Sequence, residues 1–328
     1  MGDQIYQHLP PKVLGTVLVS ALVSCASWWA LDRFIFKDRT SDQASKMSGL
    51  IRSLFSAGPA KLLQDPEKLY EVPLIEREEV SHDTRRFRFG LPSKDHVLGL
   101  PIGKHVHLFA TVNGDEVKRA YTPVSSDDNK GYVEFVIKVY FKNVHPKFPD
   151  GGKMSQHLEG LKIGETIKIR GPSGRLEYHG AGNIQIKETK DSPTKKRQVK
   201  RLSMIAGGTG IAPMLQLIRD VLKKSETDKT KLALLFANQS EKDILLRKEL
   251  EEEAAKHPDQ FKIWYTVDRA DEGWKYSTGF VNKDMIKEHL YEPDGETHVL
   301  MCGPPPMIKF VQSQLDELSW PAEDRFKY

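Results

Sequence analysis

The first folded part of the chain alternates apolar and polar positions with the two-residue period of a half-buried β-strand. The alternation runs through 84–89 and 105–109, and a longer β-prone run covers 132–140. Successive side chains of a strand point to opposite faces, so each run offers one face to a core and one to solvent. Turn-forming residues separate the runs, and Asn113-Gly114 is a strong hairpin signal. The pattern predicts an antiparallel barrel between about 69 and 186.

From residue 202 onwards, short apolar runs alternate with helical segments. The expected strands are 202–206, 231–237, 261–267 and 298–302. The expected helices are 213–222, 241–256, 282–290 and 306–318. Regular alternation of this kind implies a parallel sheet covered by helices on both faces. We therefore predict a Rossmann-like domain over 202–328, preceded by a basic, proline-containing interdomain linker at 187–201.

The amino-terminal segment has a different character, because residues 13–31 carry no charged side chain. A helix of that length roughly matches a ~30 Å hydrocarbon core, and Trp28 and Trp29 suit a membrane interface. A signal-anchor helix is the favoured interpretation. A cleaved signal peptide, a lipoprotein site at Cys25 and a buried core helix are the alternatives. We expect residues 1–68 to form a membrane anchor and tether, with a transmembrane helix at about 13–31.

The charges beside this segment predict its orientation. Four basic residues follow it within a short distance, whereas one, Lys12, closely precedes it. The four are Arg33, Lys37, Arg39 and Lys46. The positive-inside rule then puts the folded body of a single-pass protein in the cytoplasm.

Composition narrows the class of protein. A chain of 328 residues that is 39% hydrophobic and 29% charged is typical of about two globular domains. The two cysteines, Cys25 and Cys302, exclude a disulfide framework and fit a reducing compartment. The 11 histidines show no paired metal spacing, so we expect no metal. A net charge of +4 without a basic run among aromatic residues argues against binding of nucleic acid.

The stretch 119–126 combines a cation, an aromatic ring, a proline and hydroxyls. Arg119 offers a charged fork for phosphate oxygens, and Tyr121 offers a ring to lie against an aromatic group. Hydroxyls that can bond to a ring edge come from Thr122, Ser125 and Ser126. Pro123 keeps the preceding residue extended. The combination suits a phosphorylated planar cofactor, although an ordinary strand end can have the same composition.

Two glycine-containing turns have the form of anion sites. The run 150–158 places glycines, a lysine and a serine at the start of a short helix, whose first N–H groups can bind an anion. Together with Arg119 it could hold the two sides of a pyrophosphate. The run 206–213 leaves a predicted strand and enters a helix, where glycines allow a phosphate to approach the backbone closely. A capped helix start and a glycine-rich turn without a ligand are the alternatives.

Lys138 and Cys302 stand out individually. Lys138 alternates with apolar neighbours and so points away from their face, either as a solvated edge lysine or as a cofactor contact. Cys302 ends the last long predicted strand, at the edge where open α/β sheets bind ligands. Its alternative role is that of a small buried apolar residue.

In this order, the motifs resemble those of the ferredoxin-reductase-like flavoproteins. The matching runs are 119–125, 151–155, 207–213 and 302–307. The runs 137–156 and 234–247 are particularly similar to NADH–cytochrome b5 reductases. The resemblance covers about residue 69 to the carboxyl terminus. It implies an FAD-binding antiparallel β-barrel over 69–186, followed by an NADH-binding α/β domain over 202–328.

The resemblance also implies roles for individual residues. FAD would be bound by Arg119, Ala120, Tyr121, Thr122, Pro123, Val136, Lys138, Tyr140, Phe148, Gly151, Gly152, Lys153, Met154 and Ser155. NADH would be bound by Gly207, Gly208, Thr209, Gly210, Asp268, Cys302, Gly303, Pro304 and Met307. Asp268 would favour NADH by binding the ribose and repelling a 2′-phosphate, although Arg269 follows it. The family usually ends in Phe, whereas this chain ends in Tyr328.

The implied activity is hydride transfer from NADH to FAD, followed by single-electron transfer to cytochrome b5. Thr122, Lys138 and Cys302 would be the catalytic residues, with Thr122 or Ser125 stabilising the reduced flavin at its edge. Cytochrome b5 is acidic near its haem, so Lys153 and the cluster 195–197 could steer it. The alternatives are another acceptor (quinone, ascorbate radical or another haem protein) and a non-catalytic, membrane-tethered nucleotide-binding protein. Either the endoplasmic reticulum or the mitochondrial outer membrane would fit.

Overall fold

The computed structural model describes residues 58–144 and 149–328, so the predicted span at 13–31 and Phe148 lie outside the described residues. The chain divides into two units, Met1–Gly58 and Pro59–Tyr328, and the second contains every element below. Within the described ranges, no helix combines the length and the apolar character needed to span a bilayer.

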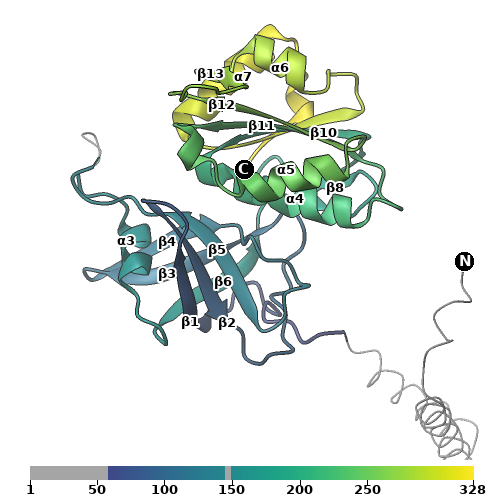
Figure 1. Cartoon of the computed structure of the whole chain (residues 1–328). Coiled ribbons are helices and arrows are strands. Elements are labelled where there is room, and N and C mark those ends of the chain that lie inside the picture. Colours follow the sequence, from purple (N-terminus) through teal and green to yellow (C-terminus); the bar gives the residue numbers. More distant parts are fainter. Residues whose placement is uncertain (1–57, 145–148) are drawn as a thin grey trace, which may run out of the picture. The chain divides into compact units, whose positions relative to one another are not determined.

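Six antiparallel strands form the first sheet of this unit (Figure 1). They are β1 (Tyr70–Glu79), β2 (Thr84–Gly90), β3 (His105–Val112), β4 (Asp115–Tyr121), β5 (Tyr132–Lys138) and β6 (Thr166–Ser173), in the order β4-β3-β6-β1-β2-β5. The antiparallel prediction is confirmed, and the barrel is a half-barrel: over the residues described, β4 and β5 are edges that do not pair with each other. Helix α3 (Lys153–Gly160) contacts β3 and β4 and buries Met154 and Leu158 in the core of this half-barrel.

The Asn113-Gly114 hairpin is confirmed. Val112 faces Asp115 across the β3–β4 pair, and both turn residues have positive φ, 53° for Asn113 and 85° for Gly114. A two-residue turn with both φ values positive matches the twist of the strands that it joins. The turn therefore fixes the register of β4 and, with it, the positions of Arg119 and Tyr121.

The second large sheet is parallel throughout. It contains β10 (Arg201–Gly207), β11 (Lys231–Asn238), β12 (Phe261–Val267), β13 (Ser277–Thr278), β14 (Thr297–Cys302) and β15 (Arg325–Lys327), in the order β13-β12-β11-β10-β14-β15. Figure 1 shows α4 (Ile211–Lys223) and α5 (Arg247–Lys256) on one face, and α6 (Lys283–His289) and α7 (Pro305–Glu317) on the other. One apolar cluster contains residues of α4 and α5, and another contains residues of α6 and α7. The prediction of a parallel sheet covered on both faces is therefore confirmed.

Two segments differ from their predictions. The helix expected at 241–256 is broken, with a short 3₁₀ turn, η2 (Glu241–Asp243), separated from α5 by Leu246 at φ 57°. Ile244 and Leu245 turn into the apolar core at this break, and their burial outweighs helix continuity. The linker predicted at 187–201 contains β9 (Lys195–Gln198), which pairs with β8 (Asn183–Ile186). Strand β7 (Leu176–Tyr178) completes a three-stranded sheet.

A buried polar network ties the three-stranded sheet to the parallel one. The Tyr178 hydroxyl donates to Asp228 Oδ2 at 2.5 Å and lies 3.0 Å from Thr230 Oγ1. The Ala181 N–H donates to the same carboxylate at 2.9 Å. Burial alone would raise the pKa of Asp228, but the hydrogen bonds from Tyr178 and Thr230 hold it below its usual value.

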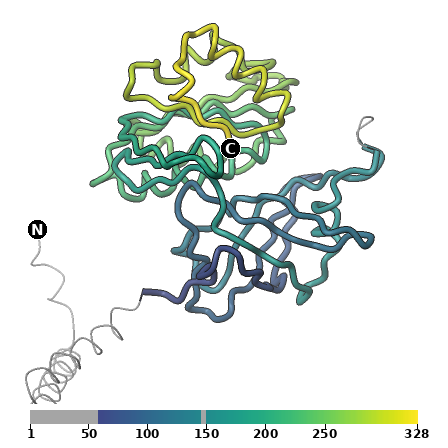
Figure 2. The backbone as a smooth tube through the Cα atoms, turned by 180° about the vertical axis from the view of Figure 1, so that it is seen from behind, coloured from purple at the N-terminus to yellow at the C-terminus, as the bar shows by residue number. Residues whose placement is uncertain are grey.

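The carboxyl terminus completes the parallel sheet. Near the C label in Figure 2, β15 adds the last strand beside β14.

Candidate functional site

The carboxyl half of β4 presents a cation beside an aromatic ring. Arg119 is exposed and donates from Nη1 to its neighbour's carbonyl, Lys118 O, at 2.8 Å. The Tyr121 ring lies edge-on to Phe135, with 6.4 Å between centroids. Burial raises the pKa of Tyr121 to about 12, with Arg119 opposing the shift and Tyr140 adding to it. The Tyr121 hydroxyl therefore lies near both Arg119 and Tyr140. It keeps its proton at neutral pH.

The turn before α3 is assembled against Tyr140. A Cβ on Gly151 would lie 2.3 Å from Tyr140 O, and one on Gly152 would lie 2.5 Å from Ser155 Oγ, so neither position admits a side chain. The Ser155 hydroxyl accepts from the Tyr140 N–H at 3.1 Å. Gly152 is the N-cap residue and has no side chain to occupy the first N–H groups of the helix, which leaves them for an anion. Met154 is only 2% exposed, and its side chain belongs to the core of the half-barrel.

The segment that follows β4 is fixed by its backbone. Pro123 and Val124 are buried, and the Val124 N–H donates to Glu134 O of β5 at 2.9 Å. The Ser125 hydroxyl accepts from the Glu134 N–H, also at 2.9 Å. Since the Ser125 oxygen already serves β5, the half-buried Thr122 is the better candidate for the flavin edge. We call residues 122–125 the flavin seat, after the role predicted for them.

The second glycine turn joins the loop after β14. Gly207 ends β10, and Gly208–Gly210 form a 3₁₀ turn, η1, that leads into α4. A Cβ on Gly207 would lie 2.4 Å from Met307 Sδ, and one on Gly210 would lie 2.2 Å from Cys302 O. Gly208 differs, because it has φ 52° and nothing within 4 Å of a Cβ built on it. The turn therefore packs on Cys302, Gly303, Pro304 and Met307 on one side and is open at Gly208.

Cys302 is half-buried in this loop. Burial raises the pKa of its thiol to about 11, so the thiol is neutral at pH 7 and is not a prepared nucleophile. Tyr328 lies beside it: the Tyr328 N–H donates to Met301 O at 3.0 Å, and its buried hydroxyl has no partner among the described residues. Burial and then Cys302 raise the pKa of Tyr328 above its usual range.

The half-barrel and the parallel sheet meet at this place. Strand β5 contacts η1. Val124 and Val136 of the half-barrel belong to the same apolar cluster as Ile211 of α4, and Cys302 and Tyr328 pack against that cluster. The structure thus brings together the residues predicted to bind the flavin and those predicted to bind NADH.

Lys138 is neither solvated nor free. Its Nζ lies 2.5 Å from Asp83 Oδ2, and the two side chains are 28% and 16% exposed. Burial alone would raise the pKa of Asp83, but the hydrogen bond and charge of Lys138 outweigh it and lower the pKa. His82, Asp83 and Asp243 also have potential metal-ligand atoms within 4.8 Å of one another. The ammonium group of Lys138 already supplies the positive charge there.

The carboxyl edge of the parallel sheet carries residues that the sequence analysis overlooked. Asn238 ends β11, is 9% exposed, and has neither side-chain polar atom bonded within the described part of the chain. The main-chain carbonyl of Asn238 accepts a hydrogen bond from the main-chain N–H of the exposed Asp268 at 3.1 Å. Phe280 and Phe310 are 74% and 42% exposed, with 6.4 Å between ring centroids. The only sequence signal for Asn238 was its place after an apolar strand, and the two phenylalanines gave none.

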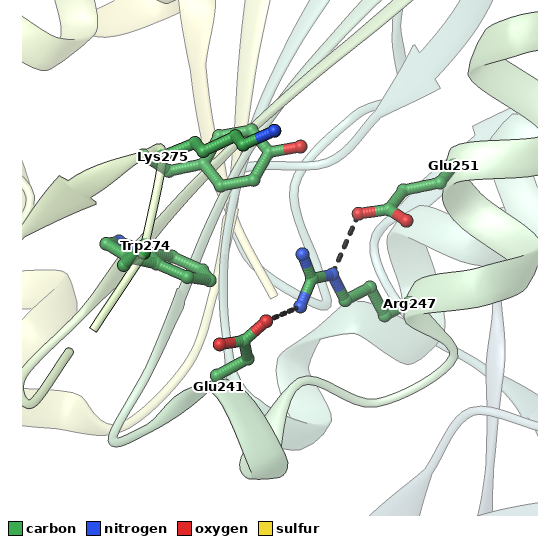
Figure 3. Close-up of a pocket in the computed structure, with 7 residues that line it drawn as sticks. Glu241, Arg247, Glu251, Trp274 and Lys275 are labelled. Carbon is green, nitrogen blue, oxygen red and sulfur yellow. Dashed lines mark hydrogen bonds and ion pairs between the residues drawn. The ribbon is translucent and has the colours of Figure 1, made fainter. Parts of the chain in front are cut away.

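A pocket of about 340 Å³ lies elsewhere, and none of the predicted site residues lines it. Figure 3 shows Arg247 between two carboxylates. It donates from Nε to Glu251 at 2.8 Å and also binds Glu241. The guanidinium lies 5.6 Å from the ring centroids of Tyr265 and Trp274. Because two carboxylates neutralise it, this network fastens the start of α5 and offers no free cation to a phosphate.

Three of the proposed steering residues are already paired. Lys153 Nζ lies 3.0 Å from Asp115 Oδ2, with both side chains more than half exposed at 53% and 67%. In β9, Lys195 pairs with Glu188, and Arg197 pairs with Asp324. The pairs of Lys153 and Lys195 are exposed, and exposed pairs are weak and exchange readily with a charged partner, whereas the Asp324 side chain is only 8% exposed.

The residues present fit FAD and NADH. An exposed arginine and an uncapped helix start lie beside Tyr121 and Tyr140, which suits a flavin nucleotide. The open Gly208 turn and the unsatisfied amide of Asn238 lie at the strand ends where α/β sheets bind nucleotides.

Comparisons with known proteins agree with this assignment. An oxidoreductase FAD-binding domain matches residues 71–178, and an oxidoreductase NAD-binding domain matches residues 204–313. NADH-cytochrome b5 reductase 2 of Gallus gallus is 60% identical over 267 residues, which cover 81% of this chain and 88% of that protein. NADH-cytochrome b5 reductase 3 of Rattus norvegicus is 56% identical, covering 85% and 93%. The cytochrome b5 reductase domain of Ulva prolifera nitrate reductase superposes with a TM-score of 0.76 at 42% identity, covering 82% of this chain and all of that domain.

Proposed function

Since the chain belongs to the NADH–cytochrome b5 reductase family, we propose that it carries electrons from NADH, through bound FAD, to cytochrome b5 at a membrane. The protein is a flavoprotein reductase with an FAD-binding and an NAD-binding domain. The observation that carries the proposal is the junction where β5 contacts η1 and where Val136 and Cys302 share one apolar cluster. Bound FAD would supply the conversion of a hydride from NADH into single electrons for a haem.

On the half-barrel side, the chain's own residues hold and orient the flavin. Arg119 and the first N–H groups of α3 face phosphate oxygens, and Tyr121 lies against the ring system. Thr122 donates a hydrogen bond at the ring edge. Lys138 would contact the flavin as one half of an ion pair with Asp83, and therefore as a hydrogen-bond donor more than as a net positive charge.

On the parallel-sheet side, the residues align NADH. The Gly208 turn takes the pyrophosphate, and Asn238 and Asp268 bind the ribose at the carboxyl edge of β11 and β12. The exposed ring of Phe280 would be available to stack on the adenine. Cys302, as a neutral thiol, acts by contact with the nicotinamide and not as a nucleophile.

Mixing experiments test the redox chemistry. The purified protein should be yellow, its flavin absorbance should fall when NADH is mixed in, and cytochrome b5 added next should become reduced. Protein that stays colourless after incubation with FAD would refute the proposed flavin-dependent activity. Bleaching by NADH without reduction of cytochrome b5 would point instead to a quinone, the ascorbate radical or another haem protein.

Lys153 is the proposed steering residue, and reversing its charge tests the docking surface. Lys153→Glu should slow cytochrome b5 reduction more at low salt than at high salt, because screening removes long-range attraction. Lys248→Glu is the control, since Lys248 is 92% exposed on α5. Equal slowing by both variants, or slowing that does not depend on salt, would argue against steering by Lys153.

The proposed anchor is the apolar run 13–31, with the body in the cytoplasm, at the endoplasmic reticulum or the mitochondrial outer membrane. The full chain should remain with membranes after an alkaline wash, and a chain beginning at residue 58 should not. Release of the full chain by that wash would contradict the anchor. Fractionation of the two organelles distinguishes the two membranes.

A further inference from the structure

One face of α4 makes polar contacts with the half-barrel. The contacting residues are Gln216, Arg219 and Lys223. Their spacing of i, i+3 and i+7 places them along one side of the helix. Gln216 Oε1 accepts from the Gly103 N–H at 2.6 Å, and Lys223 Nζ lies 2.5 Å from Asp128 Oδ2. Between them, Arg219 donates from Nη1 to Val124 O.

The contact of Arg219 differs from the other two because it reaches the flavin seat itself. The Val124 N–H already donates to β5, so Arg219 fixes the second backbone group of the same residue. Thr122 and Pro123 precede this carbonyl, and Ser125 follows it. The backbone at the flavin seat is therefore held by the half-barrel on one side and by α4 on the other.

Arg219 is itself held in place. Its Nε donates to Glu249 Oε1 of α5 at 2.6 Å, and its Nη2 lies 2.5 Å from the same oxygen. The two side chains are 34% and 33% exposed, so the guanidinium is partly withdrawn from water. A hydrogen bond from a charged donor is stronger than a neutral one.

The same helix begins at the NADH turn. Gly210 is the N-cap residue of α4, and Arg219 stands about 14 Å further along the helix axis. A 13-residue helix packed on a sheet moves as one body, so the position of η1 and the position of the Val124 carbonyl are coupled through α4.

We infer that Arg219 is a positioning residue for hydride transfer: it fixes the flavin seat, through the Val124 carbonyl, relative to the NADH turn at the other end of α4. The inference rests on the proposed FAD and NADH chemistry. Arg219 touches neither cofactor in this role. Its loss leaves the NADH turn in place but releases the flavin seat, which is part of the proposed FAD site.

The test compares Arg219→Met with Lys223→Met in the full-length holoenzyme. Both variants remove a cation from the same face of α4, but Lys223 holds the exposed Asp128 and not the flavin seat. The measurements are FAD dissociation, followed by the fluorescence of released flavin, the flavin midpoint potential, and the flavin reduction rate as a function of NADH concentration.

Arg219→Met should weaken FAD retention and lower the limiting reduction rate by about tenfold each, with an unchanged dissociation constant for NADH. Arg219→Lys should restore part of both effects, and Lys223→Met should behave as wild type. Glu249→Gln provides a second route, because it loosens Arg219 while keeping its charge; it should show the same effects at smaller size.

Wild-type FAD retention and a wild-type limiting reduction rate in Arg219→Met would overturn the inference, as would equal losses in Lys223→Met. If Arg219→Met does not fold, Glu249→Gln decides by the same readouts. FAD retention also separates this inference from the proposed function. A wild-type flavin that NADH does not bleach would refute the function, whereas the retention comparison would still report on Arg219.

Discussion

Asp83 Oδ2 lies 2.5 Å from Lys138 Nζ, so the turn between β1 and β2 neutralises the lysine that ends β5. Neither side chain is more than a third exposed. The pair explains how a lysine can stand at the junction of the two domains without being a free surface charge. A change in the charge of Lys138 will therefore also change the pKa of Asp83.

Lys138→Met should lower the free energy of unfolding by about 1–2 kcal/mol at pH 7, because it leaves a half-buried carboxylate without its partner. The wild-type pKa of Asp83 is lowered, so the pair stabilises the fold above the usual pKa of an aspartate and less as pH falls through the lowered value. The difference between variant and wild type should therefore shrink towards pH 3. Urea denaturation at both pH values measures it. Lys138→Arg is the control, and a pH-independent difference would contradict the explanation.

His298 should make the fold sensitive to acid. It is 0% exposed in β14, and both ring nitrogens lack partners among the described residues. Burial, and then the charge of Arg197, lower the pKa of His298 to about 4. The unfolded chain takes up this proton near pH 6.5, so the free energy of unfolding should fall by about 3 kcal/mol as pH drops from 6.5 to 4.

His298→Leu should remove most of this dependence and stabilise the protein at pH 5 more than at pH 7.5. Urea denaturation of both proteins at the two pH values checks it. His82→Leu is a matched control, because the His82 side chain is 73% exposed. If His298→Leu and wild type have the same pH profile, the buried imidazole is not the cause.

Tyr178→Phe should cost about 2–3 kcal/mol, because it removes the hydroxyl that donates to the buried Asp228 and leaves a carboxylate short of a partner. The flavin spectrum should not change, since none of the predicted cofactor residues that the structure describes touches this network. Thermal unfolding checks the loss. Tyr70→Phe removes an exposed hydroxyl bonded to the Asp65 N–H and should be nearly neutral. A neutral Tyr178→Phe would mean that the network does not hold the sheets together.

Asp268→Ser should raise kcat/KM for NADPH by about tenfold and lower it for NADH, because a carboxylate at the ribose repels a 2′-phosphate. Arg269 next to it would then be free to attract that phosphate. Steady-state kinetics with both nucleotides measure the ratio. Asp271→Ser, at an exposed position in the following loop, controls for a general loss of negative charge. No change in the ratio would place the ribose elsewhere.

Sequence alone predicted those features that depend on local chemistry. Asn113-Gly114 specifies its turn through backbone conformations that few residue pairs adopt. The strand–helix rhythm after residue 202 specifies a parallel sheet because each element carries its own apolar face. Gly151 and Gly210 lie where a Cβ would meet the main-chain oxygens of Tyr140 and Cys302.

Other features depended on partners distant in the sequence. Ile244 and Leu245 break the helix expected at 241–256 because the core takes them in. Strand β9 has a run of basic residues without alternation and forms because β8 is beside it. The pairing of Lys138 with Asp83, the unsatisfied amide of Asn238 and the contact of Arg219 with Val124 all arise from the folded arrangement.

The three-stranded sheet β7-β8-β9 has a consequence for recombining this protein with its relatives. Its strands lie on both sides of residue 187, and Tyr178 at its first strand is bonded to Asp228 in front of β11. In a chimera spliced at 187, β8 would come from one protein and β9 from the other. Tyr178 of the first protein would also have to bond to Asp228 of the second. The exchangeable NADH module therefore begins before Leu176, and it must carry residues 176–201 with it.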